Sequence, residues 1–145
     1  MPRPEPPVLP HWTPGTVAIL STGSGAPHAI PVSTGVRVDD RTILLALARR
    51  RESLFRLRED ARCALTILAE GDIAVTAHCM GVVVQEPMTV SDRVAAVRLD
   101  VQWMQDHGQP RFEIEAGVKW RWTEEEAERR DAEIRAALGE LAPGS

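Results

Sequence analysis

Short apolar runs separated by turn residues fill the first third of the chain. Residues 16–22, 27–38 and 42–48 are rich in Val, Ile, Leu and Thr, which favour strands. Gly and Ser dominate the first gap between these runs, and two aspartates and an arginine fill the second, which is typical of tight turns. The pattern predicts three consecutive strands that form a meander.

The hydrophobic period changes after the third run. Leu54, Leu57 and Ala61 are spaced as on one face of a helix, so residues 52–60 are predicted to form a short helix. Gly81 lies inside a later apolar segment, where it indicates a bulge or a close backbone approach. Strand character returns in three further segments, which are predicted as strands over 62–69, 73–85 and 94–106.

The C-terminal quarter contains one more alternating segment and a charged helix. Thr123 and Glu126 have the spacing of a capping box, so a helix is predicted from there to about Leu141, with a narrow apolar stripe. The apolar positions that predict a last strand before this helix are Phe112, Ile114, Val118, Trp120 and Trp122. So many antiparallel strands in 145 residues favour a barrel, because closure removes exposed edges.

The composition and charge of the chain argue against several classes of protein. The net charge of −4 argues against general nucleic-acid binding, which favours a broad basic surface. The N-terminal residues 1–14 contain six prolines and read as an extended arm rather than a signal peptide, with His11 and Trp12 as possible anchors. No apolar run is long enough to cross a membrane, so we expect a cytoplasmic protein, in which Cys63 and Cys79 are free, mostly buried thiols.

One segment departs from the acidic balance of the chain. Residues 47–60 contain five arginines in fourteen positions, just before and within the predicted short helix. A helix N-terminus and arginine side chains both favour a phosphate group, which is one interpretation of this segment. The alternative is a solvated helix face whose charges pair internally, Glu52 with Arg56 and Arg56 with Glu59 or Asp60.

The order of these motifs resembles that of one family. Residues 17–22, then 25–32, then the arginine-rich 49–62 and the strand 73–88 resemble the pyridoxamine 5′-phosphate oxidase-like flavoproteins. The resemblance implies a mainly β fold, a six- to seven-stranded antiparallel split β-barrel of Greek-key type followed by a C-terminal helix. It divides the chain into an arm over 1–14, a flavin-binding barrel over 15–122, and a helix and tail over 123–145.

The same resemblance implies a homodimer with FMN at its interface. Strand residues Val32 and Ser33 would lie near the flavin ring. The phosphate would be held by Arg49, Arg51, Ser53 and Arg56, and the backbone of Leu45, Ala46 and Leu47 would follow the ring edge. The sequence departs from the family at two of these positions, since many members have lysine where Ser53 falls and asparagine where Arg56 falls.

The function implied is that of an FMN-dependent oxidoreductase, with hydride transfer between flavin and an unidentified small molecule. No residue stands out as a general acid or base, which fits a reaction whose chemistry the cofactor supplies. Two alternatives remain open: a non-enzymatic flavin- or haem-binding module, and a deazaflavin-dependent reductase. The sequence predicts no metal site, because His78 and Cys79 have no closely spaced further ligands. Ser21 and Ser33 likewise lack the partners of a hydrolase triad.

Overall fold

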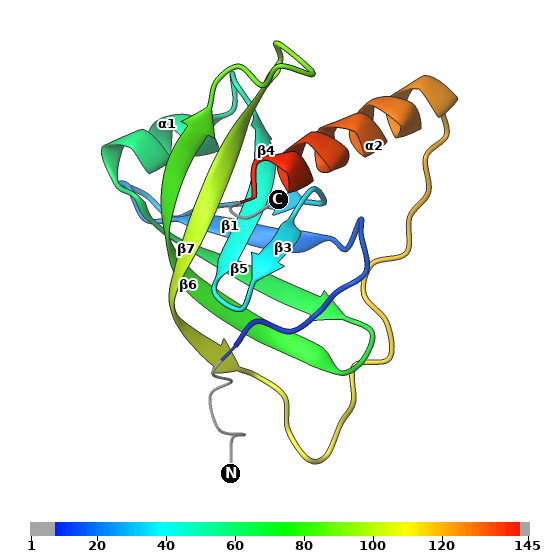
Figure 1. Cartoon of the computed structure of the whole chain (residues 1–145). Helices are drawn as coiled ribbons and strands as arrows, with labels where there is room; N and C mark the ends of the chain where they lie inside the picture. Colours follow the sequence, from blue (N-terminus) through cyan, green and yellow to red (C-terminus); the bar gives the residue numbers. More distant parts are fainter. Residues whose placement is uncertain (1–7, 143–145) are drawn as a thin grey trace.

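A computed structural model describes residues 8–142 of the chain. Within them the chain forms mostly antiparallel sheet, with a short helix after the fourth strand and a longer one at the C-terminal end (Figure 1). In chain order the elements are β1 (Ala18–Thr22), β2 (His28–Val32), β3 (Val36–Asp39), β4 (Thr42–Ala48), α1 (Glu52–Glu59), β5 (Arg62–Ala69), β6 (Ile73–Gln85), β7 (Val94–Asp106) and α2 (Glu125–Glu140).

The strands form one sheet in the order β2-β1-β5-β6-β7-β4-β3. All pairings are antiparallel, and the long strands β6 and β7 form its centre. The sheet curls around its core but is not closed, because β2 and β3 remain as edges (Figure 1). This is a split barrel, and the predicted fold class is confirmed.

The predicted meander is wrong. Residues 27–38 form two strands instead of one: β2 pairs with β1 at one edge of the sheet, and β3 pairs with β4 at the other. The reason lies at Thr34, whose hydroxyl accepts a hydrogen bond from the Ala46 N–H (3.0 Å) and donates one to the Ala46 carbonyl (3.2 Å). A side chain therefore occupies the edge of β4 where a continuous strand would have placed its backbone.

The last predicted strand is also wrong. Residues 107–122 contain no strand and run as an extended coil past the β5–β6 turn to α2 (Figure 1). Close packing fixes this coil: a Cβ on Gly117 would lie 2.5 Å from the Leu68 carbonyl oxygen. The Trp120 indole N–H donates to the Gly15 carbonyl at 3.0 Å. The coil thus packs across the end of β5 instead of joining an edge of the sheet.

The main core lies between the strands and α1. Alternate residues of β1, β5, β6 and β7 point into it, as their period of two requires. Leu54 and Leu57 of α1 close the core at one end. Gly81 lets α1 approach, since a Cβ there would lie 3.1 Å from Leu57 Cδ2, which confirms the predicted close approach.

A second, smaller core lies on the outer face of the sheet, beneath α2. It consists of Leu44, Met88, Ala96 and Leu138, so α2 covers β3, β4 and β7. The N-terminal segment also packs on the barrel, through buried Leu9 and through Trp12, whose indole donates to the Gly35 carbonyl. His11 is exposed, and the arm residues 1–7 lie outside the described part. None of the described helices is long and apolar enough to span a bilayer.

Candidate cofactor site

The arginine-rich segment connects β4 to α1. The Arg49 guanidinium donates to Glu86 Oε2 (3.3 Å) and to the Asp92 carbonyl (3.0 Å). Glu86 also forms an ion pair with Arg58 of α1, so one carboxylate holds two of the arginines. Arg50 and Arg51 are exposed, and their side chains have no partner among residues 8–142. These two are the cations of the segment that remain available to an anion.

Arg51 occupies the position immediately before α1. Its backbone is extended (φ −73°, ψ 141°), and no side chain caps the helix there. The first N–H groups of a helix carry partial positive charge and lack partners within the helix. An anion at this end would therefore meet both these N–H groups and the Arg51 guanidinium, which is the arrangement favoured for phosphate.

Ser53 points away from this surface. Its side chain is fully buried, and its hydroxyl lies 3.1 Å from His28 Nε2. The other ring nitrogen of His28 lies 3.5 Å from Glu52 Oε2. The order serine, histidine, carboxylate matches that of a hydrolase triad, but a nucleophile without exposed surface cannot meet a substrate. The three side chains instead join β2 to the start of α1.

Arg56 also serves this internal contact. Its guanidinium donates to the carbonyls of Ser24 and Ala26 in the β1–β2 turn and to Glu52 Oε1 at 3.2 Å. The Arg56 Nε atom is buried without a hydrogen-bond partner. A guanidinium that ties a turn to a helix in this way has few donors left for a ligand. The internal pairing of Glu52 with Arg56 is present as the solvated-face interpretation expected.

The predicted ring-binding residues lie along β2 and β4. Val32, Leu45 and Leu47 are buried and contribute their side chains to the main core. Ser33 is half-buried in the link between β2 and β3. The backbone of Ala46 is already hydrogen-bonded by the Thr34 hydroxyl. Main-chain contact of a ligand with β4 is therefore limited to its end near Ala48.

The structure brings the four predicted phosphate residues to one end of the barrel but divides them by direction. Arg49 and Arg51 face outward, whereas Ser53 and Arg56 face the β1–β2 turn. Sequence reasoning missed the parts played by His28, Thr34 and Glu86. Their partners are 25, 12 and 37 residues away along the chain, so no local pattern could have identified them.

Comparison with known structures shows that other split barrels share this architecture. A candidate pyridoxamine 5′-phosphate oxidase of Listeria innocua has a TM-score of 0.55 at 10% identity, over 65% of this chain and 90% of that one. An FAD-binding protein of Mesorhizobium loti has a TM-score of 0.50 at 10% identity, over 61% and 81%. The flavin reductase PheA2 has a TM-score of 0.50 at 14% identity, over 66% and 81%.

No protein-family model and no curated protein matches the chain by sequence. The structural likenesses nonetheless agree with the order of motifs in the sequence. The chain has the split β-barrel fold of the pyridoxamine 5′-phosphate oxidase-like proteins.

Proposed function

We propose that the protein is an FMN-binding homodimer that acts as an oxidoreductase on a small molecule. The observation that carries the proposal is the pair of exposed arginines, Arg50 and Arg51, at the N-terminal end of α1, whose side chains have no partner within the described residues 8–142. The FAD-binding protein and the flavin reductase among its structural neighbours support a flavin as the ligand. Because the fold is shared with proteins of other activities, the choice of FMN rests on the two exposed arginines next to the start of α1.

Bound FMN would supply the hydride chemistry. The chain's own residues would bind and orient it: Arg51 would pair with the phosphate, and the first N–H groups of α1 would complete the contact. Arg49 would contribute from the side, since Glu86 and the Asp92 carbonyl already hold its guanidinium. Ser53 and Arg56 would act indirectly by fixing α1 against the β1–β2 turn.

The proposed dimer would use the outer face of the sheet. Met80, Val82 and Val84 of β6 are exposed there, and Trp103 of β7 stacks on His78 with ring centroids 3.9 Å apart. A row of apolar side chains on an outward sheet face is typical of an interaction surface. Sedimentation of the purified protein would test this part of the proposal, because a monomer at micromolar concentration would contradict it.

The phosphate site is tested with two arginines of the same segment. Arg51→Ala should weaken FMN binding about tenfold or more, since a hydrogen bond to a charged group contributes about 1.5–3 kcal/mol. Arg58→Ala is the matched control, because Arg58 already has an ion-pair partner in Glu86. Equilibrium dialysis with FMN measures both. Equal losses in the two variants would mean that the arginines act only as diffuse charge, and no retention of FMN by the parent would refute the proposal.

One observation favours a second candidate, a non-enzymatic flavin- or haem-binding module. Ser53 and Arg56 make internal contacts, so fewer groups are left to hold a phosphate firmly. The visible spectrum of the protein as isolated separates flavin from haem. Turnover of bound flavin with a nicotinamide donor would exclude the non-enzymatic candidate. Side-by-side titration with FMN and a deazaflavin cofactor tests the deazaflavin-dependent reductase.

A further inference from the structure

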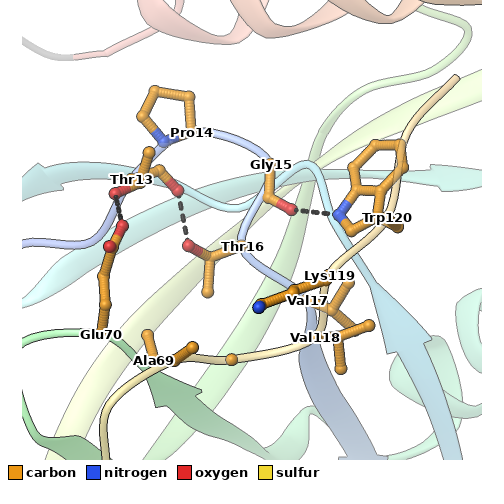
Figure 2. Close-up of a pocket in the computed structure, with 12 residues that line it drawn as sticks. Thr13, Pro14, Gly15, Thr16, Val17, Ala69, Glu70, Val118, Lys119 and Trp120 are labelled. Atoms are coloured by element: carbon orange, nitrogen blue, oxygen red, sulfur yellow. Dashed lines mark hydrogen bonds between the residues drawn. The ribbon is translucent and has the colours of Figure 1, made fainter.

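A cavity of about 370 Å³ lies between the N-terminal segment, the turn from β5 to β6, and the coil before α2 (Figure 2). None of the predicted flavin residues lines it. Its apolar wall includes Val17, Ala69 and Val118, and its polar groups include Thr13, Thr16, Glu70 and Lys119. The volume lies within the range of small-molecule sites.

Two backbone positions build the walls of this cavity. Gly15 has φ +86°, a conformation that favours glycine, and its carbonyl accepts the Trp120 indole N–H at 3.0 Å. Gly117 lies so close to the Leu68 carbonyl oxygen that a Cβ would approach it to 2.5 Å. The coil is therefore fixed at both ends of the stretch that lines the cavity. A cavity with fixed walls can bind a ligand without first ordering a loop.

Opposite charges lie on this cavity without neutralising each other. Lys119 is the single lysine of the chain, whose other cationic side chains are all arginines. It forms no ion pair or hydrogen bond within residues 8–142. Glu70 Oε1 accepts a hydrogen bond from the Thr13 hydroxyl at 2.7 Å, which orients the carboxylate. Figure 2 shows the Lys119 side chain extended toward the side of the cavity where Glu70 and Thr13 lie.

We propose that this cavity binds a small zwitterion with a short apolar body. Its carboxylate would pair with the Lys119 ammonium, and its protonated amine with the Glu70 carboxylate. The apolar body would pack against Val17 and Val118. The basis is that a ligand with both charges satisfies both side chains at once, whereas a simple anion or cation would leave one of them unpaired beside it. The site is separate from the proposed flavin site, so either proposal can fail without the other.

Calorimetric titration with L-leucine tests the charge pattern. Two half-analogues serve as controls: 4-methylpentanoate lacks the amine, and 3-methylbutylamine lacks the carboxylate. L-Leucine should bind with a dissociation constant below about 1 mM, and each half-analogue should bind at least about tenfold more weakly, since it makes one charged contact fewer. No heat from L-leucine up to about 10 mM, or equal affinity for a half-analogue, would overturn the proposal.

The single lysine gives an independent measurement. Acetylation with an amine-reactive reagent modifies only Lys119 and the N-terminal amine, so peptide mass spectrometry reports on this site directly. L-Leucine should slow acetylation of Lys119 and leave the N-terminal rate unchanged. Lys119→Met and Glu70→Gln should each weaken L-leucine binding at least about tenfold, as one charged contact is lost, whereas Arg121→Met, which removes an exposed cation outside the cavity, should not. Loss of binding in all three variants would count against a specific site.

Discussion

Gly117 is the position where a single methyl group tests the packing of the coil most directly. In Gly117→Ala the new Cβ would lie 2.5 Å from the Leu68 carbonyl oxygen and 3.5 Å from Ala69 Cα. The first distance is 0.5 Å inside the 3.0 Å limit that real Cβ contacts respect. Both partners at the contact are backbone, so no flexible side chain can move aside. Either β5 or the coil has to shift.

The size of the effect follows from what that shift disturbs. Forcing an extra methyl group into a packed site costs about 1–3 kcal/mol. A displaced coil also weakens the bond from the Trp120 indole to the Gly15 carbonyl, which contributes about 1 kcal/mol. We therefore expect Gly117→Ala to lower the free energy of unfolding by about 2–4 kcal/mol. The melting temperature should fall by about 6–12 °C, at about 3 °C per kcal/mol.

Gly139→Ala provides the matched control, because it makes the same chemical change in open space. Gly139 lies near the end of α2, and a Cβ there meets nothing within 4 Å. Alanine in a helix is favoured over glycine by up to about 1 kcal/mol, so this variant should melt at the same or a slightly higher temperature. Urea unfolding followed by tryptophan fluorescence measures both variants. Equal stability of Gly117→Ala and the parent would refute the contact between the coil and β5.

Two further predictions concern ionisable groups. Burial raises the pKa of Cys63 to about 12 and also raises the pKa of Cys79. Neither thiol should therefore react with a disulfide reagent at pH 8 until the protein unfolds. Rapid labelling of the native state would contradict their burial. The Arg62 guanidinium lowers the pKa of Asp60 from 3.8 to about 2. Because the pKa is lower in the folded state, the interaction of ionised Asp60 with Arg62 stabilises the fold above pH 3.8, and this stabilisation is lost as the pH falls through about 2. Asp60→Asn should therefore melt below the parent at pH 7, and this difference should disappear between pH 4 and pH 2.

Most strands could be predicted because their signal is local. The runs that became β1, β4, β5, β6 and β7 show the period or composition of strands within their own residues, and the structure agrees with their predicted bounds to within two residues. The order of those strands in the sheet is set by long-range pairing, which the sequence does not display. The sequence could therefore indicate a barrel, while the meander joined β2 and β3 into one strand, although they lie at opposite edges of the sheet.

The two wrong elements share a cause, since the deciding contact is made by a residue far away in sequence. Residues 112–122 have the alternation of a strand, but the backbone of Gly117 packs against the end of β5 and the segment forms a coil. At the link between β2 and β3, the Thr34 hydroxyl takes the place of a strand at Ala46. Neither contact can be predicted from the local pattern of hydrophobic and polar residues. The same limit applies to the cofactor site, where Ser53 turns toward His28.

The five arginines of residues 47–60 differ in the partners that their side chains contact. Glu86 forms ion pairs with both Arg49 and Arg58, and the carbonyls of the β1–β2 turn hold Arg56. Among residues 8–142, Arg50 and Arg51 are therefore the two arginines of the segment whose side chains have no partner. Arg50 lies in the turn that the Arg51 N–H closes onto the Ala48 carbonyl at 3.0 Å, whereas Arg51 lies directly before α1. Arg51 adjoins the N–H groups of α1, and phosphate affinity should depend mainly on that residue.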